Sequence, residues 1–357
     1  MAKHYRPFLL ARAGEFAGLS RLTALQSSIS PVFCIPERAW DYENSRYSKS
    51  HEDHISGVPD RLVSSWEGGE GFLDLSLIDS DDLVDGKHPA LYIVEATDAG
   101  SVALTPLLNS ASSPAYRLAI EAIHEEFNRG AAIQLLQADW TTINPTALTE
   151  LMESVSLSPH EIDLFIDFEG ADGPVAEVAI ATELASLRGF GNFRSVTVGG
   201  ASFPDLAGVP LGVTEYARND WNVYTSVQHK LVEQASPTPD FFDHVVQNPD
   251  LIELGVDPRV LSISAALRYT VSEKWLVAKG GLFKGRGTTS KGGAALIAPL
   301  IALVRHPEFA TPIRSLADDW IEAVIADDDR PGAPQKWREW ATVRHFEVVA
   351  HQLANLP

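Results

Sequence analysis

The stretch Ile162-Asp163-Leu164-Phe165-Ile166-Asp167-Phe168 decides the fold, because it is a short apolar run typical of a buried β-strand. Similar runs recur along the first 245 residues, and stretches of helical periodicity separate most of them. The eight runs are Phe8–Leu10, Pro31–Ile35, Gly71–Leu77, Ser101–Leu107, Ala131–Gln137, Ile162–Phe168, Arg194–Gly200 and Asp240–His244. Strands that alternate with helices form a parallel sheet, and eight such units can close into a barrel. We therefore predict an α/β fold with a (β/α)8 TIM-like barrel.

The sequence pattern changes after the eighth run. The segments Ser262–Thr270 and Lys274–Lys279 predict two antiparallel strands joined by a short turn, and the glycine-rich stretch Gly280–Gly293 follows them. Three helical stretches complete the chain, near Ala294–Val304, Ala317–Ile325 and Gln335–Asn355. A tail with so little apolar sequence is too small for a core of its own. We expect a barrel over residues 1–250 and a hairpin with a helical extension over residues 251–357, packed on the barrel.

The composition argues against several classes of protein. A formal net charge of −20 repels nucleic-acid backbones and anionic membranes, so we expect neither nucleic acid nor membrane as a partner. The longest apolar stretch, Gly292–Val304, is shorter than a membrane-spanning helix and contains Pro299. The single cysteine, Cys34, lies in the second predicted strand and can form no intrachain disulfide. We therefore expect a soluble, cytoplasmic protein.

Active sites of (β/α)8 barrels lie where the strands end, so polar residues at those positions are the functional candidates. The catalytic candidates are the carboxylates Asp74, Asp167, Glu169 and Asp243. Asp74 and Asp167 are the strongest, because each is embedded in an apolar strand where an unpaired charge is costly. Converging carboxylates can bind a divalent cation or divide acid and base roles. Alternatively, they cap helices and pair with cations at the rim, and the sequence identifies no particular metal or cofactor.

Other residues are candidates for binding a ligand. Arg12 and Glu15 follow the first run, and Ser202 follows the seventh. The segment Lys279–Lys291 is glycine-rich and basic and leads into a helix, which favours an anion site. It lacks the residue order of a P-loop and of a dinucleotide-binding turn, and its alternative interpretation is a solvated end of the hairpin. The ligand-binding candidates within it are Lys284, Arg286, Thr288 and Lys291.

Several short segments spread over nearly the whole chain match the pattern of one family. They are Tyr5-Arg6-Pro7, Gly14-Glu15, Ile29-Ser30-Pro31, Ile35-Pro36, Phe72-Leu73-Asp74-Leu75, Gly199-Gly200-Ala201-Ser202-Phe203-Pro204, Asp220-Trp221 and Trp337-Arg338. Together they resemble the Beta protein family, which phages, satellites and other bacterial mobile elements encode. The resemblance implies a cytoplasmic protein from gene modules linked to phage defence or toxin neutralisation, with no established reaction.

Three elements depart from the pattern of that family. Its aromatic-Gly-Asp-Tyr element is Phe241-Phe242-Asp243-His244 here, its Ser-Trp-Gly-Asp element is Ser315-Leu316-Ala317-Asp318, and its closing His-His is Arg344-His345. If these elements form a site, this chain binds something different from its relatives or has lost an activity.

Two classes of function are compatible with these residues. In the first, the barrel mouth recognises a protein partner, either a product of the same gene module or a phage protein. The polar segment between Trp40 and Trp66, which predicts a long loop with a short helix over the mouth, suits such a role. In the second, the chain is an enzyme for a phosphorylated or otherwise anionic small molecule, with Asp74 and Asp167 as acid, base or metal ligands. The first is favoured, because no catalytic constellation is complete, and whether the chain is an enzyme stays open.

Overall fold

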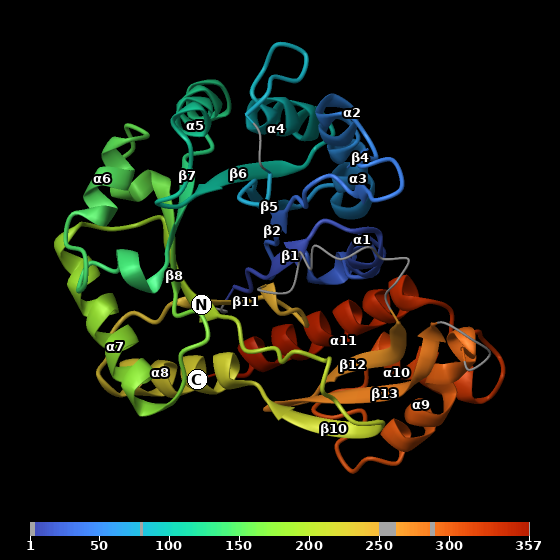
Figure 1. Cartoon of the computed structure of the whole chain (residues 1–357). Helices are drawn as coiled ribbons and strands as arrows, with labels where there is room; N and C mark the ends of the chain where they lie inside the picture. The colour runs from blue at the N-terminus through green and yellow to red at the C-terminus, as the bar shows by residue number, and fades with distance from the viewer. Residues whose placement is uncertain (1–3, 79–80, 250–261, 286–289, 357) are drawn as a thin grey trace.

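The computed structural model describes residues 4–78, 81–249, 262–285 and 290–356. At its centre lies an eight-stranded parallel sheet in the order β1-β2-β5-β6-β7-β8-β9-β11 (Figure 1). Its strands are β1 (Phe8–Leu10), β2 (Val32–Cys34), β5 (Glu70–Asp74), β6 (Ala103–Leu108), β7 (Ala131–Leu135), β8 (Ile162–Asp167), β9 (Ser195–Gly200) and β11 (Asp240–Asp243). A parallel bridge between Tyr5 and Phe241 joins the two outer strands and closes the ring. The predicted (β/α)8 barrel is confirmed.

Helices enclose the ring on its outer side. They are α1 (Ala13–Leu19), α2 (His51–Ser56), α3 (Val58–Trp66), α4 (Pro89–Ala99), α5 (Pro114–Phe127), α6 (Ala147–Glu153), α7 (Gly173–Ser186), α8 (Asn219–Glu233) and α11 (Pro334–Ala354). Short 3-10 turns lie at Thr23–Leu25, Gln137–Asp139, Pro159–Glu161, Leu187–Gly189 and Gly292–Leu296. Although α11 comes last in the chain, it packs against α1 beside the barrel (Figure 1). Among the helices of the described residues, none has the length and apolarity needed to cross a membrane.

Two glycines allow α1 and α11 to pack closely. A Cβ atom at Gly14 would lie 2.8 Å from the backbone oxygen of Gln335, and one at Gly18 would lie 2.9 Å from that of Glu339. Contacts this short require the neighbouring backbone to move. The absence of a side chain at both positions therefore fixes the distance between the first and last helices of the barrel.

A second sheet lies beside the barrel, at the lower right of Figure 1, in the antiparallel order β10-β13-β12. It consists of β10 (Gly212–Ala217), β12 (Ile263–Thr270) and β13 (Lys274–Lys284), with α9 (Ile297–Val304) and α10 (Leu316–Ile325) next to it. The predicted hairpin and helical extension are confirmed. The sequence analysis missed β10, which is only half-buried, and placed the end of β13 too early, because its glycines suggested a loop.

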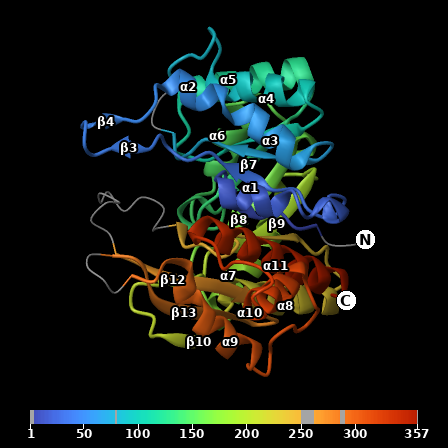
Figure 2. The ribbon, with the colours of Figure 1, turned by 90° about the vertical axis from the view of Figure 1, so that its right-hand side faces the viewer.

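The segment after β2 contains more structure than the predicted long loop with one short helix. Strands β3 (Trp40–Asp41) and β4 (Arg46–Tyr47) form a small antiparallel hairpin, and α2 and α3 follow it. Figure 2 shows this hairpin projecting from the molecule on the side away from the C-terminal end of α11. Because β2 ends at Cys34, the hairpin stands on the face formed by the carboxyl ends of the barrel strands.

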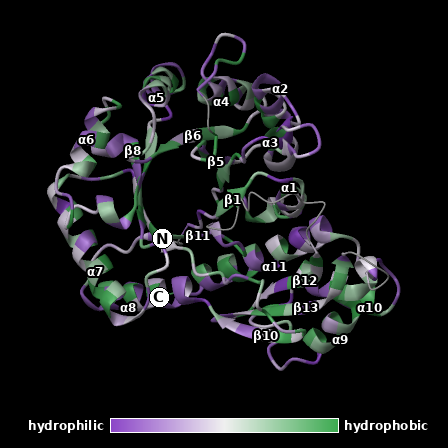
Figure 3. Cartoon of the chain, viewed as in Figure 1, coloured by the Kyte–Doolittle hydropathy of each residue, from purple (hydrophilic) through white to green (hydrophobic). Residues whose placement is uncertain are grey.

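The interior of the barrel is filled by side chains. Aromatic rings of β1, β8 and β11 meet there: Phe8 lies 5.9 Å from Phe165 and 5.1 Å from Phe242, measured between ring centroids. In Figure 3 the hydrophobic colour runs along β5 and β6, whereas hydrophilic residues collect in the peripheral loops. Contact between these rings excludes water below the barrel mouth, so that polar side chains are accommodated at the ends of the strands.

We expect Gly18→Ala to destabilise the protein, although alanine favours a helix interior over glycine by about 1 kcal/mol. The new Cβ atom would press on the backbone of Glu339 and on Thr342, whose Cβ atom would be 3.0 Å away. Overpacking of this kind costs about 1–3 kcal/mol, which urea denaturation can measure. Gly57→Ala is the control, because its Cβ would come no closer than 3.7 Å to another atom. A free energy of unfolding that rises for Gly18→Ala would contradict the packing argument.

Candidate functional site at the barrel mouth

The polar residues at the mouth follow from the alternation of side chains along the strands. Asp74 and Asp167 end β5 and β8, and the residues two positions earlier, Phe72 and Phe165, meet inside the barrel with their ring centroids 5.2 Å apart. Side chains two residues apart share a face of a strand, so both aspartates also face the interior. Gln134 of β7 joins them, because its Nε2 donates a hydrogen bond of 2.8 Å to Oδ2 of Asp167. The two strongest candidates of the sequence analysis therefore lie at one end of the barrel, and their catalytic role stays a prediction.

Asp167 is held by two hydrogen bonds inside the wall of the barrel. Its Oδ2 accepts from Gln134, and its Oδ1 accepts from the backbone N–H of Glu169 at 2.7 Å. Burial opposes ionisation more strongly than these donors favour it, and the pKa of Asp167 rises to about 7. At neutral pH this carboxyl therefore exchanges a proton readily, as acid–base catalysis or proton-linked binding requires. The side chain of Glu169 is exposed, and its backbone has a positive φ of 53°.

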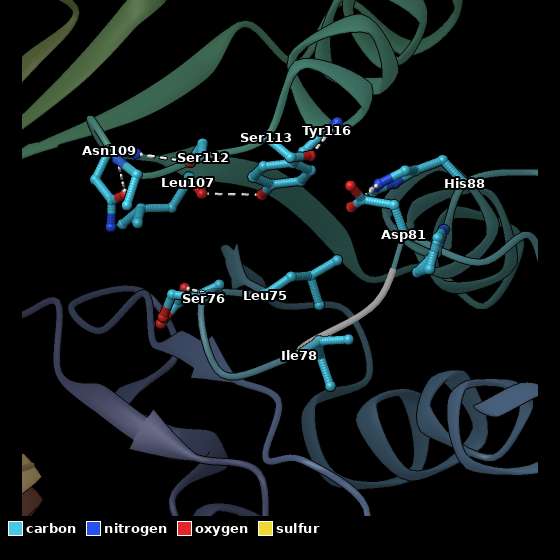
Figure 4. Close-up of a pocket in the computed structure, with 13 residues that line it drawn as sticks. Leu75, Ser76, Ile78, Asp81, His88, Leu107, Asn109, Ser112, Ser113 and Tyr116 are labelled. Carbon is cyan, nitrogen blue, oxygen red and sulfur yellow. Dashed lines mark hydrogen bonds and ion pairs between the residues drawn. The ribbon is translucent and has the colours of Figure 1, made fainter. Parts of the chain in front are cut away.

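Asp74 borders a pocket of about 240 Å³ between the ends of β5 and β6 and the helices α4 and α5. Figure 4 shows Leu75, Ser76 and Ile78 on one wall of this pocket, facing Leu107, Asn109 and Tyr116 on the other. Oδ1 of Asp74 accepts a hydrogen bond of 2.8 Å from the backbone N–H of Ser76. Burial raises the pKa of Asp74 above its ordinary value. Both interior aspartates are therefore weaker acids than aspartates in water.

A second acidic group lies at the edge of the same pocket. Oδ1 of Asp81 is 3.1 Å from Nε2 of His88, as Figure 4 shows. Burial alone would raise the pKa of Asp81, but hydrogen bonds from Ser113 and His88 lower it. Burial lowers the pKa of His88, with Asp81 opposing the change. One pocket is thus lined by a protonatable carboxyl from Asp74, an anion from Asp81 and an imidazole from His88.

Asp243 does not reach the mouth, because it faces outward from β11 and is covered by α11. Its Oδ1 accepts from the hydroxyl of Tyr5 at 2.6 Å, and its Oδ2 lies 2.8 Å from Nε2 of His345. Burial would raise the pKa of Asp243, but His345, Arg218 and Tyr5 lower it. The ionised carboxylate can only accept, so Nε2 of His345 carries the proton and Nδ1 accepts from Thr270 at 2.9 Å.

Further buried charges surround this pair. The guanidinium of Arg218 donates to the backbone oxygens of Val271 and Ser272 and to Gln352. Asp220 lies near it, and burial, together with the charge of Asp243, raises the pKa of Asp220 to about 7. The predicted ligand-binding residue Ser202 belongs to the same region, where its hydroxyl accepts a hydrogen bond from the backbone N–H of Asp220 at 3.1 Å.

The three elements that depart from the family pattern meet around this buried cluster. Arg344 lies 3.2 Å from Asp318, and the hydroxyl of Tyr269 donates to Asp318 at 2.7 Å. Arg344 also donates to the backbone oxygens of Thr270, Ile313 and Thr311. Because Asp318, Arg344 and the adjacent His345 are fully buried, these bonds attach the second sheet and its helices to the barrel.

None of the remaining ligand-binding candidates that the structure describes lines the pocket beside Asp74. Glu15 is buried at the start of α1, where it accepts from Gln247 at 2.8 Å and lies 3.4 Å from Arg338. Arg12 directly precedes α1, and Lys284 ends β13. The backbone N–H of Lys291 donates to the oxygen of Leu282. Arg286 and Thr288 fall outside the described residues.

The sequence analysis did not select Gln134, although the same signal was present. Gln134 is a polar residue inside the apolar run Ala131–Leu135, as Asp167 is in its own run. Among the described residues, the ligand atoms of Glu215, His306 and Glu308 lie close enough together to hold a metal ion. Nζ of Lys274 lies 2.9 Å from Glu215 and 3.0 Å from Glu308. The ammonium group therefore already supplies the positive charge that would hold these carboxylates together.

Comparison with known proteins agrees with the sequence pattern. A sequence profile described as Beta protein matches residues 5–351. The chain belongs to the Beta protein family. A search of curated proteins finds no match. The C-terminal domain of a candidate chitinase from Desulfitobacterium hafniense DCB-2 aligns at 12% identity and a TM-score of 0.30, covering 99% of this chain and 100% of that domain. A TM-score this low supports no inference about this Beta protein.

We expect Asp167→Asn to change how stability depends on pH. The folded state raises the pKa of Asp167 from 3.8 to about 7, so its stabilising contribution is full below pH 4 and is lost as the pH rises through 7. At about 1.4 kcal/mol per pKa unit, the variant should gain on the order of 3 kcal/mol relative to the wild type between pH 4 and pH 8. Urea denaturation across this range measures the difference.

Asp60→Asn, at an exposed aspartate in the first turn of α3, is the control for Asp167→Asn and should run parallel to the wild type. If the curves of Asp167→Asn and the wild type were also parallel from pH 4 to pH 8, the titration assigned to Asp167 would be wrong.

We expect Asp243→Ala to destabilise the protein by about 3–5 kcal/mol, because removing one partner leaves buried polar groups without theirs. His345 and the hydroxyl of Tyr5 would both lose a hydrogen bond. Asp243→Asn keeps the shape and one acceptor, and should lose less. Thermal and urea denaturation measure both effects, and a loss below about 1 kcal/mol for the alanine variant would show that the network is not needed for stability.

Proposed function

We propose that this Beta protein is a cytoplasmic component of an anti-phage or toxin-neutralising gene module and recognises a protein partner with the carboxyl face of its barrel. The observation that carries the proposal is the β3–β4 hairpin, which projects from that face (Figure 2). The partner is a product of the same module or a phage protein. The setting is what the resemblance to the Beta protein family implies, and the composition of the hairpin supports the mode of recognition.

The hairpin has the residues that contribute most to protein interfaces. The side chain of Trp40 is 44% exposed and meets Tyr47 edge to face, with ring centroids 5.1 Å apart. On the other side, the guanidinium carbon of Arg38 lies 3.9 Å from the centroid of Tyr47. Tryptophan, tyrosine and arginine are the residue types enriched at binding hot spots. Because stacking fixes these rings before binding, little side-chain entropy is lost when a partner covers them.

The charge of the chain constrains the partner. With a net charge of −20, this protein attracts a positively charged partner over long distances and repels an acidic one. The hairpin itself carries both a positive and a negative charge, because Arg46 lies opposite Asp41 on the paired strands. We therefore propose a basic partner that contacts Trp40 and Tyr47 through an apolar or aromatic patch.

A specific observation also favours a second function, catalysis on an anionic small molecule. Asp74 borders a pocket of about 240 Å³, and Asp167, whose pKa is about 7, lies on the same end of the barrel. In this alternative the two carboxyls exchange protons with a bound substrate. Replacing both by asparagine would then abolish protection against phage while leaving partner binding intact.

We expect Trp40→Ala to weaken partner binding at least about 30-fold, the loss typical of a hot-spot residue. The measurement is a pull-down from infected cells with the tagged full-length chain, followed by titration of the recovered protein. Leu118→Ala is the matched control, because Leu118 is a large apolar residue that is 65% exposed on α5.

Two results would contradict the recognition proposal. One is a wild-type chain that recovers no partner during infection. The other is a Trp40→Ala variant that binds the partner as tightly as the wild type. If protection instead depends on Asp74 and Asp167 and not on Trp40, the catalytic alternative replaces it.

A further inference from the structure

A larger cavity lies beside the barrel mouth, away from both Asp74 and the β3–β4 hairpin. It is open to solvent on one side and has a volume of about 500 Å³ between β12, the start of α11 and the segment that follows β9. Its apolar lining includes Ile263, Ala266 and Ala341. Among the described residues, the charged side chains of its lining are Arg268, Lys279 and Arg338, all of them basic. No acidic side chain of the described lining accompanies these three cations, although the chain has a net charge of −20.

The three cations differ in how well the protein satisfies them. Nζ of Lys279 donates to the backbone oxygen of Leu206 at 2.9 Å, which fixes the ammonium group at the cavity wall. Arg338 has one ionic neighbour, Glu15, at 3.4 Å. Among the described residues, Arg268 has no hydrogen bond or ion pair, and its guanidinium carbon lies 5.3 Å from the ring centroid of Phe203. Because Arg268 is half-buried and lines the cavity, its donors are available to a ligand there.

The charges around the cavity also affect one another. Burial and the nearby charge of Arg338 lower the pKa of Arg268 to about 10. Among the described residues, Glu15 is the carboxylate whose charge opposes this shift, and burial raises the pKa of Glu15 while Arg338 opposes that change. One oxygen of Glu15, Oε2, is buried without a hydrogen-bond partner. Glu15 is thus under the influence of Arg338, Arg12 and Arg268, while the charge of Arg338 disfavours the ionised form of Arg268.

We propose that this cavity binds the phosphate group of a small phosphomonoester between Arg268 and Arg338. A guanidinium presents two parallel N–H groups that match two phosphate oxygens, and Lys279 adds a point charge. The volume is within the range of small-molecule sites, so the apolar walls leave room for the organic part of the ligand. The ring of Trp337, which also lines the cavity, is fixed edge to face by Phe283 with 5.3 Å between centroids. The site is independent of the proposed recognition by the hairpin.

The test is calorimetric titration of the full-length protein with inorganic phosphate, ribose 5-phosphate and ribose. We expect both phosphorylated probes to bind and ribose not to bind, with ribose 5-phosphate tighter than inorganic phosphate because it also fills the apolar part. Arg268→Gln and Arg338→Gln should each weaken phosphate binding at least tenfold. Arg314→Gln is the matched control, because it removes the same charge from an exposed arginine that pairs with Asp319 and Glu322 on α10.

Thermal denaturation separates a binding defect from a folding defect. In phosphate-free buffer, Arg268→Gln should melt no lower than the wild type, since it removes one member of a repelling pair. Added phosphate should raise the melting temperature of the wild type and of Arg314→Gln, but not that of Arg268→Gln. The proposal is overturned if the wild type binds neither phosphorylated probe, if Arg268→Gln binds them as tightly as the wild type, or if Arg314→Gln loses binding equally.

Discussion

The main-chain pairing of Tyr5 with Phe241 is the contact on which the rest of the structure depends. The backbone N–H of Arg6 donates to the oxygen of Phe241 at 2.9 Å, and that of Phe241 donates to His4 at 3.2 Å. Without these bonds the eight strands would form an open sheet with two edges. Once the ring is closed, every second side chain must enter a space of fixed width. Aromatic rings fill this space, and Asp74 and Asp167 face inward only where the strands end.

The same closure also determines the outer side of the barrel. On β11, Phe242 faces inward, so the next residue, Asp243, faces outward and is covered by α11. The hydroxyl of Tyr5 reaches Asp243 from the strand that closes the ring. A carboxylate in this place has lost its water and depends on Tyr5 and His345 for compensation. The pair that closes the barrel is thus adjacent to the polar network that holds α11 and the second sheet in place.

The sequence predicted what depends on local pattern. The number of apolar runs predicted the barrel. A charged residue inside an apolar run singled out Asp74 and Asp167 as candidate site residues. The sequence could not predict whether the side chain of Asp243 faces the barrel interior or the surrounding helices. Both faces of a barrel strand are buried, and Phe241 and Phe242 are both apolar, so the alternation of apolar and polar residues carries no signal there. The sequence analysis also missed the meeting of Arg268 and Arg338, which lie 70 positions apart on different elements and meet only in the folded chain. Pairings of this kind depend on topology rather than on neighbours in sequence.

Glu15 connects the basic cavity with the mouth of the barrel. Its Oε1 accepts from Gln247, just beyond β11, and lies 3.4 Å from the guanidinium of Arg338. An anion bound to Arg338 competes with Glu15 for the same donors and brings a second negative charge close to it. Either effect favours protonation of the buried carboxyl or its movement toward Gln247. If the proposed site is occupied, its ligand would therefore change the contacts of Glu15 at the end of β11, and by reciprocity a molecule that displaces Gln247 would change the affinity of the cavity.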